Sequence, residues 1–438
     1  MWFSRFILTS VVLLLFGRAG ADETEQMLSL SGLLGTVTVD GSQWQRLDLR
    51  PKFGGGGLEA VLDLELFLDD EGRFRNLGWD FSTRRKGLES VLRKIHYVRY
   101  GEPNDPKRRI YLRIGSLESV TLGQGMIMRR YRNTMDSPAL KKTGLDFELR
   151  ELGYGRLSIR GVINNFLDLD SGGPVVGGRV TFRPGSGMEI GVTAVVDTDQ
   201  LSGLPDSVRA GMKEKDYGLF GVDVSYPLLR GPIAHMSIYG GISRTMLSDE
   251  SGMGLSGPGI LLRTGGLTVQ AEYRWVEGHF SPGHFDALYE FNRATLSAGR
   301  DTIVTREETL ENLTLQGVFG NVRLSLGPLL EAEGSYQHLS GKGNDDRRLG
   351  GRAYLKPALL RQLPQIEMAE AYYENRRRGS GGVNFFDASP DTRFGYKLGL
   401  NPVPKLSIIL DVEFSYLPDG AGAFMRRRSF NLQSIISL

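Results

Sequence analysis

The amino-acid sequence predicts an all-β fold, a transmembrane antiparallel β-barrel of about 18 strands, with about 16 to 20 as the expected range. Most of the chain after residue 42 consists of runs in which apolar and polar residues alternate, as the successive side chains of a strand do. Many runs are about ten to fourteen residues long, whereas strands of soluble proteins usually have about five or six. Aromatic residues gather toward the ends of the runs, where a membrane strand meets the interface.

The N-terminus has the features of a secretory signal peptide. Arg5 precedes an apolar run over residues 6–16, and Ala19 and Ala21 have the spacing of small residues at a cleavage site. The run is much shorter than the ~20 residues that a membrane-spanning helix needs. We therefore expect residues 1–21 to be a signal peptide and residues 22–438 to form a single β-barrel domain.

The alternation is clearest in two runs. Within residues 58–66, Leu62 and Leu64 lie on the face opposite Asp63 and Glu65, and residues 267–275 show the same pattern. A soluble β-sandwich or propeller also alternates apolar and polar side chains. The length of the runs, and the lack of a helical segment of domain size between them, favour the membrane barrel.

The connections between the runs are of two kinds. Compact turns rich in Gly, Pro and Asn occur, for example, at residues 184–187 and 401–405. Longer polar stretches, which we expect to be long loops, occur at residues 69–88, 197–215, 277–310 and 376–392. Short turns on one rim and long loops on the other are typical of outer-membrane barrels.

The last residues form an amphipathic run. Phe430, Leu432, Ile436 and Leu438 share one face, and polar residues occupy the other. This run is similar to the C-terminal strand that the outer-membrane insertion machinery recognises, although that signal usually ends in Phe or Trp and this chain ends in Leu438.

Most of the chain, in its architecture, therefore resembles Gram-negative outer-membrane β-barrel proteins of the porin kind. Residues 112–134 and 281–293 resemble segments of uncharacterised proteins of this group. The resemblance implies a location in the outer membrane of a Gram-negative bacterium, contact with outer-membrane lipid, and assembly by the barrel-insertion machinery through the C-terminal strand. It implies a location more firmly than an activity.

Composition and motifs argue against several other functions. With 53 Lys and Arg against 51 Asp and Glu, the chain has no excess charge to attract a nucleic acid. The absence of cysteine excludes thiolate metal sites and cysteine nucleophiles. His279 and His284, near Glu277, Asp286 and Glu290, are the only cluster dense enough for a metal, and a polar loop is the better interpretation. No catalytic motif stands out, so we expect neither an enzyme, nor a bound metal, nor a cofactor.

The polar faces of the predicted strands carry both signs of charge, which suits a water-filled lumen. We expect passive diffusion of small polar solutes through a channel. The alternatives are a non-conducting barrel with a structural or assembly role and a substrate-specific transporter, and no oligomeric state is indicated. The residues expected to line the lumen are Arg46, Arg50, Asp63, Glu65, Arg109, Arg113, Arg129, Asp146, Glu148, Arg160, Arg179, Arg183, Glu272, Arg274, Asp411 and Glu413.

One long loop contains a predicted helix. Ser281 can cap it, Pro282 suits its first turn, and the residues that follow are good helix formers. This loop either lies on the surface or folds into the lumen and narrows it. The residues expected at such a constriction are Phe285, Asp286, Tyr289, Glu290 and Arg293.

Charge is unevenly distributed along the chain. Residues 93–136 contain several more basic than acidic residues, and Arg109, Arg113 and Arg129 fall on predicted polar faces. One arc of the wall is therefore expected to be basic, which favours zwitterionic or weakly anionic solutes. Alternatively, these arginines pair with Asp146, Glu148 and Glu65 and only brace the wall.

Overall fold

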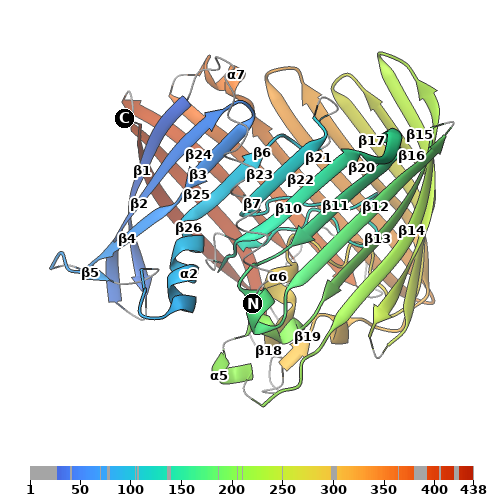
Figure 1. The fold of residues 1–438 in the computed structure, drawn as a ribbon, viewed down its shortest axis with the longest axis horizontal. Coiled ribbons are helices and arrows are strands. Elements are labelled where there is room, and N and C mark those ends of the chain that lie inside the picture. The colour runs from blue at the N-terminus through green and yellow to red at the C-terminus, as the bar shows by residue number, and fades with distance from the viewer. Residues whose placement is uncertain are drawn as a thin grey trace.

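The computed structural model describes residues 27–39, 42–69, 71–75, 79–103, 105, 108–135, 140–185, 187–204, 206–209, 211–248, 250–296, 303–363, 365–378, 392–403, 406–418 and 424–437. The proposed signal peptide, residue Leu438 and most of the predicted loop 376–392 lie outside these residues. The described part forms one large antiparallel sheet that closes on itself (Figure 1).

The sheet contains 22 strands among the described residues, and pairing of the first strand with the last closes it. Strands β3 and β4 lie end to end along β2, and β5 pairs only with β4. Counting β3 and β4 as one strand and leaving out β5 makes twenty strands around the wall, which is even and within the predicted range. The predicted all-β barrel is confirmed by this pairing.

The strands of the first half of the sheet are β1 Met27–Val39, β2 Ser42–Gly55, β3 Leu58–Leu62, β4 Leu64–Leu68, β5 Phe74–Arg75, β6 Ile95–Tyr100, β7 Ile110–Gly115, β10 Gly144–Glu151, β11 Leu157–Ile163, β12 Val175–Gly185 and β13 Met188–Asp197. Those of the second half are β14 Tyr217–Arg230, β15 Ala234–Leu247, β16 Gly252–Thr264, β17 Leu267–Gly278, β20 Leu315–Leu326, β21 Leu330–Gly341, β22 Asn344–Leu355, β23 Ile366–Arg378, β24 Arg393–Val403, β25 Leu406–Pro418 and β26 Phe424–Ser437.

Successive residues of the wall strands face opposite environments. In β13, Val192 is 39% exposed on the outer face, whereas the next residue, Thr193, is 4% exposed and faces the lumen. In β20, Val318 and Val322 are likewise exposed, and Phe319 between them is buried inside. The outer face is thus apolar and the inner face largely polar. This is the arrangement that a barrel in lipid requires.

The two rims of the barrel differ in most of their connections. Tight turns, such as those at residues 56–57, 265–266 and 327–329, join strands at one rim, which we call the short-turn rim. Long connections leave the other rim, the long-loop rim. The short elements between wall strands are α2 Arg84–Arg93, β8 Thr134–Met135, β9 Leu140–Lys141, α3 Leu152–Gly155, α4 Asp168–Ser171, η1 Gln200–Gly203, α5 Asp206–Arg209, α6 Tyr289–Asn292, β18 Ala294–Leu296, β19 Ile303–Thr305, η2 Glu307–Thr309 and α7 Pro357–Leu360. Within the described part of the chain, every helix is too short or too polar to cross a bilayer.

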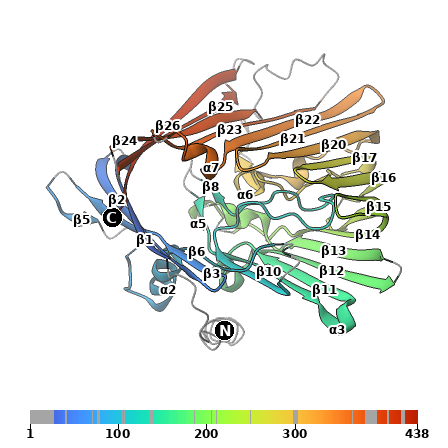
Figure 2. The ribbon, with the colours of Figure 1, turned by 90° about the horizontal axis from the view of Figure 1, so that it is seen from above.

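Two connections fold inward instead of outward. We call residues 116–133, which follow β7, the first inner segment, and residues 279–296, which follow β17, the second inner segment. Figure 2 shows α6 and β8 within the ring of wall strands. Apolar side chains of both segments form one buried core with inward-facing residues of the wall: Leu117, Val120, Leu122, Met126, Ile127, Met128, Tyr131, Val162, Val175, Val195, Tyr217, Leu219, Val276, Phe280, Phe285, Tyr289, Leu315 and Leu339. Part of the lumen is therefore filled by protein.

The helix predicted after Ser281 is mostly absent, since only Tyr289–Asn292 is helical. The preceding residues run beside the first inner segment. The Gly283 and Phe285 N–H groups donate to the carbonyls of Met126 and Ile127 at 2.8 and 3.1 Å. These hydrogen bonds satisfy the backbone inside the barrel and hold it extended, so the local helical preference is overridden.

Candidate functional site

The two inner segments are joined by backbone pairing. In addition to the bonds from Gly283 and Phe285, the Arg129 N–H donates to the Phe285 carbonyl at 2.9 Å. The centres of the Phe285 and Tyr289 rings are 4.6 Å apart. These two segments contain the parts of the sequence that resemble other barrel proteins, and the structure brings them together.

A buried ionic cluster fixes the second inner segment to the wall. It consists of Arg293, Glu290, Asp197 and Lys142. Arg293 is 1% exposed and donates from Nη2 to Asp197 Oδ1 at 2.6 Å and to the Gly173 and Asp199 carbonyls at 2.8 and 3.0 Å. Its Nη1 lies 3.3 Å from Glu290 Oε2, and Lys142 Nζ lies 2.8 Å from the same oxygen.

The charges in this cluster stabilise one another. Burial alone would raise the pKa of Glu290, but Lys142 and Arg293 outweigh it and lower that pKa to about 2. Burial would lower the pKa of Arg293, but Asp197 and Glu290 raise it above its usual range. The hydroxyl groups of Tyr131 and Tyr289 donate to Glu290 and Asp197. All these groups are therefore charged or hydrogen-bonded in their buried positions.

Two further sets of contacts anchor the second inner segment. Arg306 makes a two-point contact with Asp286, with Nη1 2.9 Å from Oδ1. Burial raises the pKa of Asp286, but Arg306 more than compensates and lowers it. At the other end, Arg348 on β22 donates to the Ser281 hydroxyl at 2.9 Å and Arg376 on β23 donates to it at 3.1 Å.

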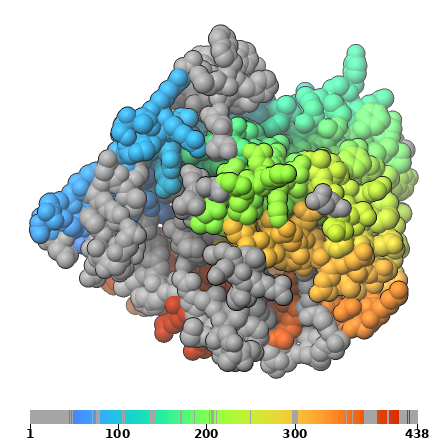
Figure 3. Space-filling model, turned by 90° about the horizontal axis from the view of Figure 1, so that it is seen from below, coloured from blue at the N-terminus to red at the C-terminus, as the bar shows by residue number. Residues whose placement is uncertain are grey.

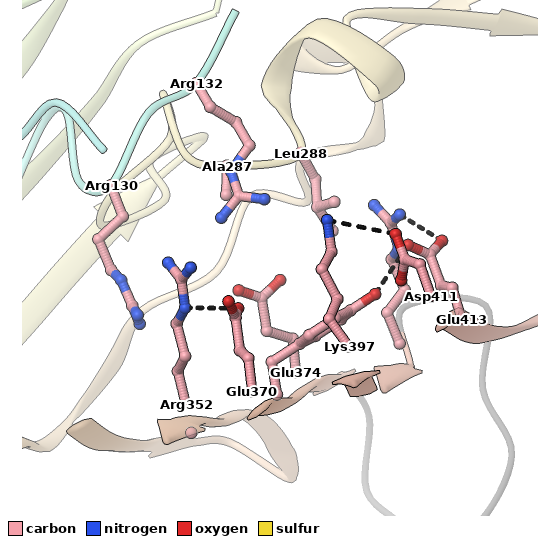
Figure 4. Close-up of a pocket in the computed structure, with 13 residues that line it drawn as sticks. Arg130, Arg132, Ala287, Leu288, Arg352, Glu370, Glu374, Lys397, Asp411 and Glu413 are labelled. Atoms are coloured by element: carbon pink, nitrogen blue, oxygen red, sulfur yellow. Dashed lines mark hydrogen bonds and ion pairs between the residues drawn. The ribbon is translucent and has the colours of Figure 1, made fainter. Parts of the chain in front are cut away.

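Between the inner segments and one side of the wall lies a polar pocket, with an empty volume of about 800 Å³ that is partly open to solvent. Arg130 and Arg132 line it from the first inner segment, and Ala287 and Leu288 from the second (Figure 4). Inward-facing residues of four adjacent strands, β22 to β25, line the opposite side. These are Gly351, Arg352, Glu370, Tyr372, Glu374, Arg393, Lys397, Asp411 and Glu413.

Most charges on the wall side of the pocket are paired. Arg352 Nε lies 2.7 Å from Glu370 Oε1, and Lys397 Nζ lies 3.2 Å from Asp411 Oδ2. Glu413 accepts from both Arg393 and Tyr372. These pairs align along the wall, as the dashed lines in Figure 4 show.

Two charges in the pocket differ from the others. Arg132 has no ion-pair partner within the described residues, and its Nε atom is buried without a hydrogen bond there. Glu374, on β23, likewise has no side-chain partner in the described part of the chain. Arg130 lies 3.5 Å from Glu333, which is a long ion pair. Among the described residues, the pocket therefore presents an unpaired arginine on the inner-segment side and an unpaired carboxylate on the wall side.

The structure places most of the predicted lumen residues on the inward side of the wall. Asp146 and Arg160 face each other across β10 and β11 at 2.8 Å, and Arg179 Nη2 donates to Asp223 at 2.8 Å. Arg274 lies 2.5 Å from Glu272. The inward-facing set comprises Arg50, Asp63, Glu65, Arg113, Asp146, Glu148, Arg160, Arg179, Glu272, Arg274, Asp411 and Glu413. The side chain of Arg46 lies outside the described residues.

Three predicted residues do not line the middle of the lumen, although Arg183 lies in β12 on the same face as Arg179 and Thr181. Arg109 is 74% exposed at the short-turn rim, where it pairs with Glu151 at 3.1 Å, and Arg183 pairs with Glu189 at the same rim. Arg129 belongs to the first inner segment, and its guanidinium lies 4.3 Å from the centre of the Phe319 ring. Burial and the nearby Arg274 and Arg130 lower the pKa of Arg129. For Arg129, the period of two was extended into a segment that leaves the wall.

The two histidines of the loop cluster that was considered as a metal site lie in different surroundings. His284 is buried against the rings of Tyr217, Phe285 and Tyr289, and His279 lies 3.4 Å from Glu250. Within the described residues, no three His, Asp or Glu side chains are grouped so that they could hold a metal ion.

Sequence reasoning missed the residues that line the pocket on β22 to β24. The alternation of Glu370, Tyr372 and Glu374 with smaller or apolar residues in β23 was a usable signal for an inward polar face. Arg132 gave no such signal, because its position depends on the folding of the first inner segment into the lumen.

No protein-family model matches the chain, and no curated protein matches it. Several solved structures are similar over most of its length. OccK11 (OpdR) of Pseudomonas aeruginosa has 13% identity and a TM-score of 0.34, covering 94% of this chain and 96% of that one. The outer membrane protein OpdK of the same organism has 12% identity and a TM-score of 0.32, covering 94% and 97%. CdiB from Escherichia coli has 10% identity and a TM-score of 0.38, covering 78% and 65%. The assignment of the fold rests on the strand pairing of this chain itself.

Proposed function

We propose that the protein is an outer-membrane channel through which small hydrophilic solutes diffuse passively. The polar pocket beside the inner segments carries this proposal. It is partly open to solvent, and charged side chains from both the inner segments and the wall line it. The apolar outer face and polar inner face of the wall support a location in a membrane, with water in the lumen.

The charges of the pocket favour solutes that carry a negative group or both signs. Arg132 and Glu374 lie on opposite sides of it and lack partners within the described residues. A zwitterion can oppose both charges at once, with its anionic group toward Arg132. The wall arginines named in the sequence analysis are mostly paired, so they brace the wall, and selectivity depends on the pocket.

The test is conductance of the purified, folded protein in planar bilayers, together with reversal potentials in a salt gradient. We expect Arg132→Gln to shift ion preference toward cations and Glu374→Gln to shift it toward anions, since each removes one uncompensated charge. Arg183→Gln, at the exposed short-turn rim, is the matched control and should leave the reversal potential unchanged.

A folded protein with no conductance at any applied voltage would contradict the channel. It would favour the non-conducting barrel instead, for which the apolar core inside the lumen is the supporting observation. If the barrel conducts but the two pocket variants behave like Arg183→Gln, the solute path lies elsewhere in the lumen.

A further inference from the structure

Helix α2, Arg84–Arg93, lies on the outside of the barrel next to the short strand β6 (Figures 1 and 2). Its inner side contacts the wall: Leu92 and Ser90 are buried, and the Leu92 carbonyl accepts a hydrogen bond from the Thr143 hydroxyl at 3.0 Å. The Lys94 carbonyl, just after the helix, accepts from the Asp63 N–H at 2.8 Å. The helix is thus fixed to the wall at its C-terminal end.

The depth of the helix follows from these contacts. Asp63 directly precedes β4, whose five residues span roughly 16 Å toward the long-loop rim. The ten residues of α2 span about 15 Å. In Figure 1 the helix runs from its end beside β6 toward the same rim. The first turn of α2 therefore lies near the level of the long-loop rim, and its later turns lie beside the part of the wall next to that rim.

The side of α2 that faces away from the barrel is amphipathic. Leu88 and Val91 are 41% and 52% exposed, and their spacing of three places them on one face of the helix. Arg84, four residues before Leu88, lies at the rim end of the same face, and Arg85 is next to it. Exposed apolar residues deeper in the membrane and cations at the rim are the pattern of an interfacial helix.

The three basic residues at the rim end of α2 differ in whether they have an ion-pair partner. Lys86 pairs with Asp80 at 2.8 Å, whereas Arg84 and Arg85 are exposed and make no hydrogen bond or ion pair with any other described residue. Arginine binds phosphate well because its planar guanidinium can donate two parallel hydrogen bonds. The two arginines therefore present an open phosphate-binding surface at the level where lipid head groups lie.

We infer that α2 binds a lipid with more than one phosphate group in the leaflet next to the long loops, with its phosphate groups on Arg84 and Arg85 and its acyl chains on Leu88 and Val91. The inference rests on the membrane location in the proposed function, not on conduction. The occupant is a lipid because charge and apolar surface occur together at the depth of a head group and its chains. Figure 3 shows the light-blue atoms of this part of the chain at the edge of the long-loop face.

Native mass spectrometry of the detergent-purified barrel tests this, with bisphosphorylated lipid A as the probe and its monophosphorylated form as the comparison. Each arginine near a charged lipid surface contributes about 1 kcal/mol, so Arg84→Gln with Arg85→Gln should weaken binding of the bisphosphorylated lipid roughly 30-fold. The monophosphorylated form should be affected less. Arg230→Gln with Arg263→Gln, two exposed arginines at the short-turn rim, is the matched control and should bind as the unaltered protein does.

Equal binding of both lipids by the unaltered protein, or equal loss in the control pair, would overturn the inference. Heat-modifiable gel mobility shows that each variant is folded. Conductance is measured in parallel in bilayers of zwitterionic lipid, where the α2 variants should conduct normally. If the α2 variants lose lipid selectivity but conduct normally, the result bears on the lipid site of α2 and not on the channel. If the unaltered protein binds the lipid but does not conduct, only the proposed channel function is contradicted.

Discussion

Arg293 holds the second inner segment in the lumen, and its replacement by methionine tests whether the buried ionic cluster keeps that segment in place. Methionine retains length and apolar contacts but removes the guanidinium. The change deletes the 2.6 Å contact with Asp197, the 3.3 Å contact with Glu290 and the donors to the Gly173 and Asp199 carbonyls. Wall strand pairing involves none of these groups.

The expected cost follows from what remains. Removing one partner of a buried ion pair usually costs about 3–5 kcal/mol, because the other charge stays buried. Here Asp197 keeps the Tyr289 hydroxyl at 2.7 Å, and Glu290 keeps Lys142 at 2.8 Å. We therefore expect a free-energy cost of about 3 kcal/mol, at the lower end of that range. A cost of this size increases the opening of the second inner segment roughly 100-fold.

Hydrogen exchange of residues 281–296 and single-channel recording measure this opening. We expect faster exchange confined to the inner segments, noisier or larger conductance, and an unchanged heat-modifiable barrel. Arg183→Met is the control, since its pair with Glu189 is largely exposed and is worth about 0–1 kcal/mol. If Arg293→Met exchanges and conducts like the unaltered protein, the ionic cluster does not hold the segment.

Two further predictions concern the outward face of the wall and the stability of the second inner segment in acid. Arginine at Val192, in the middle of β13 on the outer face, should destabilise the inserted barrel by about 2–4 kcal/mol. Arginine at Val403, at the short-turn rim, should cost only about 0–1 kcal/mol. Denaturant titration in vesicles compares the two variants, and equal costs would show that Val192 does not face lipid. The pKa of Glu290 is about 2 in the fold against 4.5 without its partners, so its ~3 kcal/mol of stabilisation is complete above about pH 4.5 and is lost as the pH falls toward 2. Exchange of residues 281–296 should accelerate over that interval. In Glu290→Gln this acid dependence should become weaker, leaving the part that Asp286 contributes through its own lowered pKa. An unchanged pH profile in the variant would exclude Glu290 as a source.

The sequence by itself determined the class of fold and the orientation of most strand residues. In β17, Glu272 and Arg274 were expected on the polar face and lie inside, while Tyr273 between them is exposed. This could be predicted because neighbouring strand residues point to opposite faces whatever the rest of the chain does. The contacts of Phe285 with Tyr289 and of Glu290 with Arg293 could also be predicted, since they join residues only three or four apart.

Only the tertiary structure decided what fills the lumen and which charges remain uncompensated. The pattern of residues 116–133 continues the period of two closely enough that Arg129 was expected on the wall, yet this segment folds inward and pairs with residues 283–285. The partners of Arg293, at Asp197 and Gly173, are about a hundred residues away in the chain. Arg132 and Glu374 likewise face one pocket from distant segments. Local periodicity specifies the face of a strand, but ion pairing and inward packing depend on closure of the whole barrel, which brings these distant residues together.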